Sequence, residues 1–246
     1  MLEQIILGTV QGIVEWLPIS SEGVVVLLAK NFFGQTSLEL LIKKALFLHL
    51  GTFLAALIYF RKEVFFLLKD RKLLNFLIIS TLISGLLGYG LVKIFLEIPA
   101  KTVILIIGLL LLLTAGFQLK TKKQEYKERK DLTFRDGILL GLVQGLAALP
   151  GLSRSGLTVS TLLIRRFKSS EALTLSFLMS LPIVLGGNII LNFNQFAFSP
   201  ENLLGLLFSF IFGFLTIGLL LKLAEKINFG YFVLIFALLI IVSVLI

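Results

Sequence analysis

The chain has 246 residues, of which 57% are hydrophobic and only 15% are charged, whereas an average soluble domain has about 45–50% apolar and about 25% charged residues. This composition excludes an ordinary soluble protein, and recurring apolar runs without the period-two alternation of a membrane β-barrel indicate an all-α polytopic membrane protein. The absence of cysteine excludes disulfides and thiolate metal sites, and the net charge of +9 comes from basic segments between the apolar runs, a placement typical of cytoplasmic loops rather than of a nucleic-acid-binding surface.

Apolar segments long enough to cross the roughly 30 Å hydrocarbon core occur six times. They are residues 39–60, 73–96, 102–119, 171–193, 202–221 and 229–246. Two more apolar stretches, 2–33 and 134–164, are interrupted by Pro, Gly and Ser, which leaves arms of roughly 10–16 residues. At about 1.5 Å per residue such an arm is too short to cross. We therefore expect two re-entrant helical hairpins, whose non-helical backbone is tolerated where it is buried in protein or lines a cavity.

The basic loops predict how these elements are oriented. RKEVFFLLKDRK and KTKKQEYKERKD are both expected inside the cell, and the basic cluster RRFK at 165–168 returns to that side only if 134–164 is a hairpin. EIPAK and NFNQFAFSPEN, which carry little or no basic charge, then fall outside. Counting back, the first hairpin enters from outside and the second from inside. The prediction is one integral membrane domain, 1–246, with inverted repeats at about 1–119 and about 134–246 and a basic linker at about 120–133.

The two broken stretches also share residues. At an offset of 133, identical residues align at five positions: Gly8, Gln11, Gly12, Ser20 and Gly23 with Gly141, Gln144, Gly145, Ser153 and Gly156. None of the five is aliphatic, so a shared bias toward Leu and Ile does not explain them. Inverted repeats with broken helices place a site near the midplane, where the breaks meet.

The polar residues of the two breaks are complementary. Glu15 aligns with Ala148, and Ser21 aligns with Arg154, so one repeat supplies a carboxylate and the other a guanidinium. Glycines, a helix N-terminus and the planar fork of Arg154 suit a phosphate group. We expect Glu15 as a general base, Ser21 (or Ser20) as nucleophile or phosphate ligand, and Arg154 as the phosphate-binding catalytic residue. The remaining predicted substrate-binding residues are Gln11, Ser20, Glu22, Gly23, Gln144, Gly151, Ser153, Ser155 and Gly156.

Structural explanations compete with each of these roles. A buried Glu–Arg pair can simply be a salt bridge, although ionisable groups at membrane depth cost about 2.5–3.5 kcal/mol each, which favours function. Serines in membrane helices often bond to backbone carbonyls, and the two glutamines, Gln11 and Gln144, can satisfy freed backbone groups. His49, the one histidine of the chain, is interpreted as a helical residue rather than a catalyst. The glycines of LISGLLGYG are interpreted as close helix packing.

At the two breaks the sequence resembles the undecaprenyl-pyrophosphate phosphatase family, known also as the bacitracin-resistance proteins. GTVQGIVEWLPISSEG is similar to the family's (E/Q)xxxE followed by LPxSSxG, and LPGLSRSG is similar to its PGxSRSG motif. LHLGTFLAALIYFRKE and LSFLMSLPIVLGG also match, so the resemblance covers nearly the whole chain.

The resemblance implies ten helices with two re-entrant pairs in interlocked inverted repeats. It implies hydrolysis of a polyprenyl pyrophosphate to the monophosphate and inorganic phosphate, which recycles the lipid carrier of cell-envelope glycans at the outer face of the cell membrane. It assigns Glu15 as the second motif acid, Ser21 as nucleophile or phosphate ligand and Arg154 as the phosphate-binding arginine, with Gln11 at the first acid position. A divalent cation, Mg²⁺ or Ca²⁺, is implied as cofactor, with Glu15 and Glu22 as candidate ligands.

The chain departs from the family pattern in two places. Val24 stands where the family's SSxGH motif has its histidine, and Glu22 replaces a small Ser or Thr. Glu22 is a candidate to supply the lost proton transfer. His49 is not expected to do so, because it lies on a separate spanning helix.

Two other functions are weighed against hydrolysis. A transporter that carries a polyprenyl phosphate across the bilayer without hydrolysing it would use the same inverted repeats, and a structural scaffold would leave the paired acid and arginine unexplained. The lipid's chain length, serine or water as the nucleophile, and a homodimeric state stay open.

Overall fold

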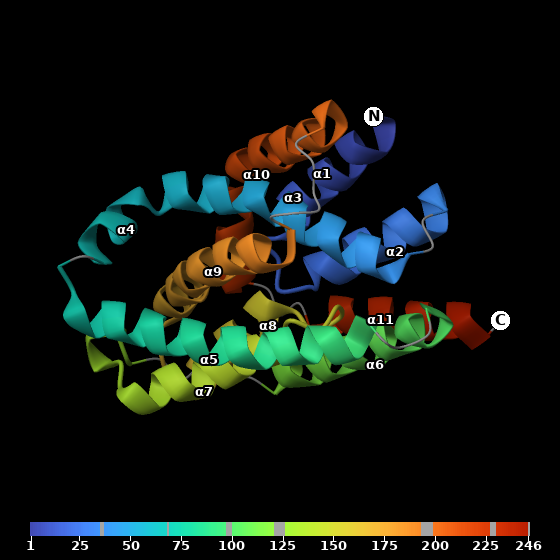
Figure 1. The fold of residues 1–246 in the computed structure, drawn as a ribbon. Coiled ribbons are helices and arrows are strands. Elements are labelled where there is room, and N and C mark those ends of the chain that lie inside the picture. The colour runs from blue at the N-terminus through green and yellow to red at the C-terminus, as the bar shows by residue number, and fades with distance from the viewer. Residues whose placement is uncertain are drawn as a thin grey trace.

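The computed structural model describes residues 1–34, 37–67, 69–96, 100–120, 126–192, 199–226 and 230–245. Within these ranges the chain forms helices and no strands, as the composition predicts (Figure 1). The helices are α1 (Leu2–Val14), α2 (Ser21–Phe33), α3 (Leu38–Tyr59), α4 (Arg61–Leu67), α5 (Arg71–Leu96), α6 (Ala100–Leu119), the 3-10 turn η1 (Arg129–Asp131), α7 (Phe134–Leu146), α8 (Arg154–Ile164), α9 (Ser169–Asn192), α10 (Pro200–Lys226) and α11 (Gly230–Leu245). The predicted turn EIPAK, the linker and NFNQFAFSPEN lie partly outside the described residues.

In the part of the chain that the structure describes, four helices are long and apolar enough to cross a membrane, which makes the chain a multi-pass membrane protein. The candidate spans are Glu39–Tyr59, Arg71–Phe95, Ser169–Asn192 and Pro200–Leu223. The other two predicted crossings, 102–119 and 229–246, fall on α6 and α11, which have 20 and 16 residues.

Both broken stretches are helix pairs with a short non-helical connection, as predicted. α1 and α2 have 13 residues each, and α7 and α8 have 13 and 11. At about 1.5 Å per residue each arm is at most about 20 Å long. The same residue type begins each returning arm: Ser20 caps α2 by accepting from the Gly23 N–H, and Ser153 caps α8 by accepting from the Gly156 N–H.

The helices of the two halves interlock. α1 packs along α10, and the corresponding helix of the second half, α7, packs along α5. α3 and α9 contact each other, and so do α6 and α11. In Figure 1, α1, α3 and α10 lie on one side, α5, α6, α7 and α11 on the other, and α8 and α9 between them. The breaks of both helix pairs therefore lie in the interior.

Aligned glycines allow the closest of these contacts. A Cβ on Gly8 of α1 would lie 2.2 Å from the carbonyl oxygen of Gly205 in α10, and a Cβ on Gly141 of α7 would lie 3.0 Å from the carbonyl oxygen of Ser80 in α5. Both distances are too short for a side chain, so the backbones touch through these small residues. The glycines that align between 2–33 and 134–164 thus dock each broken helix against a long helix that is distant in the sequence.

The beginning of α7 and the end of α8 lie together. Arg165 Nε is 2.8 Å from Asp136 Oδ1, although the residues are 29 positions apart. Just outside the two helices, Lys127 forms a parallel bridge with Phe167, and Lys168 Nζ contacts Glu128 Oε1 at 2.5 Å. The stretch that contains α7 and α8 therefore returns to the level at which it began.

One helix was not expected. The resemblance implies ten helices, and the described ranges contain eleven α-helices because RKEVFFL folds as α4 between α3 and α5. Phe65 and Phe66 on this short helix are 64% and 56% exposed. An apolar surface flanked by Arg61 and Lys62 is typical of a helix that lies in the membrane interface. The expectation for this segment rested on its charges alone, and a count of charges cannot distinguish an interfacial helix from a solvated loop.

Candidate active site

Glu15 is the residue that caps the C-terminus of α1, at the first break. The next residue, Trp16, fixes the chain direction: its indole N–H donates to the Gly213 carbonyl oxygen at 3.0 Å, and its ring lies 5.3 Å from that of Phe177. Trp16 is 1% exposed and Glu15 is 6% exposed. A buried carboxylate is stable only if it is paired and hydrogen-bonded, so its partners define the site.

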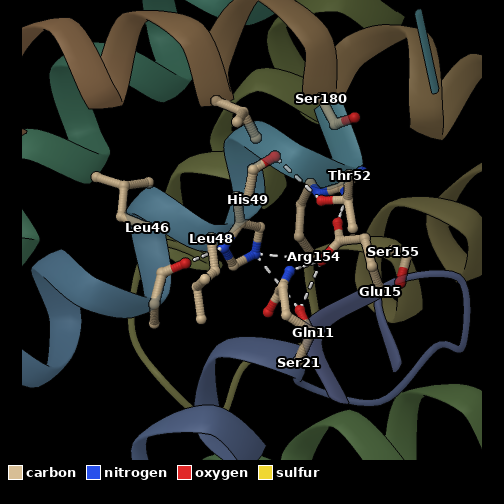
Figure 2. A network of polar contacts seen from close by, with 12 residues as sticks. Gln11, Glu15, Ser21, Leu46, Leu48, His49, Thr52, Arg154, Ser155 and Ser180 are labelled. Carbon is tan, nitrogen blue, oxygen red and sulfur yellow. Dashed lines mark hydrogen bonds and ion pairs between the residues drawn. The ribbon is translucent and has the colours of Figure 1, made fainter. Parts of the chain in front are cut away.

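Four side chains surround the Glu15 carboxylate (Figure 2). Oε1 accepts from Arg154 Nη2 at 2.5 Å. Oε2 accepts from Gln11 Nε2 at 2.9 Å and from Ser21 Oγ at 2.7 Å, and it lies 3.2 Å from His49 Nε2. The expectation that the two breaks bring the acid and the guanidinium into contact is confirmed.

Arg154, the first residue of α8, is held in a defined orientation. Its Nη1 donates to the Ser176 carbonyl oxygen of α9 at 3.1 Å, and its Cζ lies 5.4 Å from the centre of the Phe177 ring. The guanidinium therefore bridges α1 and α9 and lies over an aromatic face, which suits arginine better than lysine. Its contacts are all from a fixed protein scaffold, so the positive charge is preorganised for an anion in the cavity.

Ser20 joins the two breaks as well as capping α2, and Ser153 caps α8. The Ser20 hydroxyl accepts from the Gly151 N–H of the opposite break at 3.0 Å as well as from Gly23 N–H at 3.2 Å. The Ser153 hydroxyl accepts from Gly156 N–H at 3.1 Å. These bonds fix the N-termini of α2 and α8 beside each other, so two helix dipoles point into the same region.

The three predicted glycines lie behind the site, where they let the breaks approach. Gly151 has φ +103°, and a Cβ there would lie 2.7 Å from the Ile107 carbonyl oxygen. A Cβ on Gly156 would lie 3.0 Å from the Pro18 carbonyl oxygen, and one on Gly23 3.3 Å from the Gly151 nitrogen. Their positions account for the Gly residues of both motifs without a substrate contact, and substrate binding by them stays a prediction.

The two aligned glutamines occupy different environments. Gln11 donates to Glu15, whereas Gln144 Nε2 donates to Ser84 Oγ of α5 at 3.1 Å. In the described part of the chain the Oε1 atom of each is buried without a hydrogen-bond partner. Gln144 also lines the cavity, beside Ser84 and Thr81. Ser155 donates to the Leu17 carbonyl oxygen of the first break at 3.2 Å.

Sequence reasoning missed His49. It was set aside because it lies on a separate helix, and that argument is wrong: Nε2 is 3.2 Å from Glu15 Oε2 and 3.4 Å from Ser21 Oγ (Figure 2). α3 packs against both α1 and α2, so a residue of α3 reaches the break between them. The sequence did contain a signal for this role: Val24 stands where the family motif has a histidine, and the one histidine of the chain, His49, is found elsewhere.

The side chains present do not form a cage for a divalent cation. Both oxygens of Glu15 are already bound by donors. Glu22 lines the cavity, and within the described residues no group of three or more His, Cys, Asp or Glu side chains is placed to hold a metal. Mg²⁺ and Ca²⁺ require several oxygen ligands, so we derive no step of the reaction from a protein-bound metal.

The site opens into a cavity of about 490 Å³. At its polar end lie Glu15, Ser21, Glu22, His49 and Arg154. Apart from Thr81, Ser84 and Gln144 and the serines of the two breaks, the rest of the lining is apolar. This part runs between α5 and α9, whose lining residues include Leu82, Leu86, Tyr89, Ile183, Ile190 and Leu191. The volume is typical of a small-molecule site, and one polar end with an apolar extension fits an amphipathic ligand.

Glycines make the apolar part of the cavity. Gly85 of α5 and Gly186 and Gly187 of α9 line it, and a Cβ on Gly186 would meet nothing within 4 Å. The interpretation of LISGLLGYG as close packing is therefore correct only for Gly88, where a Cβ would lie 3.0 Å from the Ala148 side chain. At Gly85 the missing side chain leaves space in the cavity instead.

The chain matches the family described as bacitracin resistance protein BacA over residues 4–242. It is 41% identical to the undecaprenyl-diphosphatase of Methanococcoides burtonii, over 94% of this chain and 93% of that protein. It is 36% identical to the protein of the same name from Methanothrix thermoacetophila, over 94% and 92%, and 37% identical to that from Sulfurisphaera tokodaii, over 93% and 91%.

Proposed function

Because this chain belongs to the bacitracin resistance protein BacA family, we propose that it is an enzyme that hydrolyses undecaprenyl-type polyprenyl pyrophosphate to the monophosphate and inorganic phosphate. The reaction recycles the lipid carrier used in the synthesis of cell-envelope glycans. The observation that carries the proposal is the contact between Glu15 and Arg154 at the polar end of a cavity whose lining is otherwise mostly apolar.

Each part of the cavity has a role in this reaction. The pyrophosphate lies at the polar end, where Arg154 and the N-termini of α2 and α8 stabilise negative charge on the transferred phosphoryl group. The isoprenoid tail follows the apolar part between α5 and α9. Catalysis of phosphoryl transfer depends mainly on positioning and electrostatics, and the site supplies both from side chains held by neighbouring helices.

The membrane topology in this proposal is a pair of inverted repeats. α1–α2 and α7–α8 are re-entrant hairpins, α3, α5, α6, α9, α10 and α11 are the six spanning helices, and the cavity opens to the outer face of the cell membrane. Support comes from the arms of at most about 20 Å, from the reciprocal packing of α1 on α10 and α7 on α5, and from the Arg165–Asp136 pair that joins the two ends of the second hairpin.

A divalent cation enters this scheme with the substrate. The site already holds two carboxylates, Glu15 and Glu22, against the one guanidinium of Arg154, and a pyrophosphate adds further negative charge. A cation that arrives with the substrate would offset part of this negative charge, and we assign it no ligand from the protein.

The purified protein in detergent is expected to release inorganic phosphate from farnesyl pyrophosphate, a short surrogate of the lipid. Release is measured colorimetrically, with and without chelator. A protein that only transports a polyprenyl phosphate releases none, so an absence of phosphate in both conditions contradicts the proposal. Arg154→Ala serves as the matched blank for contaminating phosphatases.

Gly186→Leu is expected to obstruct the tail part of the cavity and to discriminate between substrates. The new side chain projects into open space, and a helix interior accepts leucine more readily than glycine, so the fold is preserved. We expect KM for a long polyprenyl pyrophosphate to rise at least tenfold (about 1.4 kcal/mol), with a smaller change for farnesyl pyrophosphate.

The matched control for this variant is Gly90→Leu. Gly90 is also in a long helix, α5, and a Cβ there would meet nothing within 4 Å, but it does not line the cavity. Equal effects of the two substitutions on KM would contradict the proposal that the isoprenoid tail binds in the apolar part of the cavity. So would an unchanged KM of Gly186→Leu for the long substrate.

A further inference from the structure

We propose that His49, from α3, is the proton-transfer residue of this enzyme, and that it takes the place of the histidine that the family pattern has at position 24. The inference rests on the proposed hydrolysis and adds a residue to it. It is carried by the position of the imidazole between Glu15 and Ser21, at 3.2 and 3.4 Å from Nε2.

The geometry defines which ring nitrogen exchanges the proton. Nδ1 lies 2.7 Å from the Ala45 carbonyl oxygen one turn earlier in α3. A carbonyl only accepts, so Nδ1 carries a proton in both charge states, and Nε2 is left as the exchangeable position. With a proton, Nε2 donates to Glu15 Oε2; without one, it is an acceptor for Ser21 Oγ or for a water beside it. Nε2 of His49 therefore has a hydrogen-bond partner in both charge states of the imidazole.

Helix packing explains why a residue of α3 points here. Gly51 of α3 faces α10, where a Cβ would lie 2.6 Å from the Leu206 carbonyl oxygen, and the Ser209 hydroxyl donates to the Leu48 carbonyl at 2.8 Å. His49 precedes Gly51 by two residues, about 200° around the helix, so it projects away from α10 and toward the break.

Position 24 lies on the same helix as Ser21, whereas position 49 reaches Ser21 from α3. Val24 is three residues after Ser21 in α2, so both side chains lie on one face of that helix. A histidine at 24 would approach Ser21 from α2, and His49 approaches it from α3. The chain therefore retains an imidazole at the site although the motif histidine is absent.

In the reaction the attacking oxygen, from Ser21 or from a water, forms a bond to the terminal phosphorus. Its proton moves to Nε2 of His49, and the bond to the bridging oxygen breaks, with its electron pair leaving on the lipid monophosphate. Glu15 then faces an imidazolium and stabilises it, as a carboxylate does in a nucleophile–histidine–acid triad. The two oxygens of Glu15 already accept hydrogen bonds from Arg154, Gln11 and Ser21, so His49 is the group placed to take the proton.

If water attacks, inorganic phosphate forms directly and His49 passes its proton to solvent. If Ser21 attacks, His49 first passes its proton to solvent; a water then attacks the phosphorus of the phosphoserine and gives its proton to Nε2, the bond from phosphorus to Ser21 Oγ breaks, and Ser21 Oγ takes that proton from His49.

The test compares wild type, His49→Gln and the double variant Val24→His/His49→Gln in the phosphate-release assay. We expect His49→Gln to lower kcat at least 100-fold, to change KM less than threefold and to remove the acidic limb of the kcat–pH profile. The double variant should regain at least tenfold in kcat and the acidic limb. His49→Asn gives the same comparison if the glutamine variant does not stay monodisperse in size-exclusion chromatography.

Two controls separate proton transfer from a structural role. Thr52→Val alters α3 one turn away, where the hydroxyl donates to the His49 carbonyl oxygen at 3.0 Å, and it should retain kcat within twofold. The charged or titratable groups that face His49 are Glu15 at the end of α1, Glu22 on α2 and Arg154 on α8. Because Glu22 could also titrate, the acidic limb must persist in Glu22→Gln.

The inference is overturned if His49→Gln keeps kcat within threefold of wild type, or if Val24→His recovers neither kcat nor the acidic limb. Failure of the hydrolase proposal looks different, since the wild-type protein would then release no phosphate.

Discussion

Arg154→Ala is expected to lower kcat/KM for phosphate release by about 10³–10⁵-fold, the range in which a single arginine stabilises a phosphoryl-transfer transition state. The guanidinium is the one cationic side chain whose contacts place it at the polar end of the cavity with a fixed orientation among the described residues, through Ser176 and Phe177. Arg154→Lys should recover no more than about tenfold, because an ammonium lacks the planar fork. Both are measured on purified protein in detergent.

The control for Arg154 must exclude misfolding. Removing one partner of a buried ion pair costs about 3–5 kcal/mol of stability, so thermal unfolding and monodispersity are measured alongside activity. Arg135→Ala, which removes an exposed arginine near the start of α7, should leave activity unchanged. Near-normal phosphate release by folded Arg154→Ala would contradict the proposed site.

Glu15→Gln is expected to lower kcat on the order of 10³-fold, about 4 kcal/mol in barrier. The amide keeps the size of the side chain but removes the charge that pairs with Arg154 and faces His49. Glu39→Gln is the matched control, because the Glu39 side chain is 57% exposed and, among the described residues, pairs with Lys43 on its own helix, α3.

The double variant Glu15→Gln/Arg154→Met distinguishes chemistry from a structural salt bridge. Replacing both members of a buried pair by neutral side chains is often nearly neutral for stability, so we expect the double variant to unfold within about 1–2 kcal/mol of wild type. Its activity should stay as low as that of Arg154→Ala. Recovery of activity together with stability would mean that the pair only holds the breaks together.

Much of this fold could be predicted from residues that are contiguous in the sequence. The length of an apolar run predicts a crossing, Pro18 and Pro150 with their neighbouring Ser and Gly predict the breaks, and Ser20 and Ser153 cap the helices that follow. These signals act over a few residues, so they can be interpreted without knowing what packs against them. The contact of Glu15 with Arg154 could be expected in the same way, because each residue lies at one of the two breaks and the breaks were predicted to meet.

Other features depend on how helices face each other. The role of Gly85 differs from that of Gly88, three residues later, because a Cβ at Gly88 would lie 3.0 Å from the Ala148 side chain, whereas one at Gly85 would lie at an ordinary contact distance of 3.7 Å from Ile183. The donors that occupy Glu15 come from both breaks and from α3, which is why a metal-ligand role looked plausible from the sequence and does not fit the structure.

The chain's own residue order thus establishes a membrane protein with two broken helices that carry an acid and an arginine. The packing of α3 on α10 decides that a lone histidine from a distant helix completes the site, through the rotation of that helix at Gly51. That rotation results from backbone contacts between elements 155 positions apart, from Gly51 to Leu206, and no local pattern records which side of a uniformly apolar helix will face its neighbour.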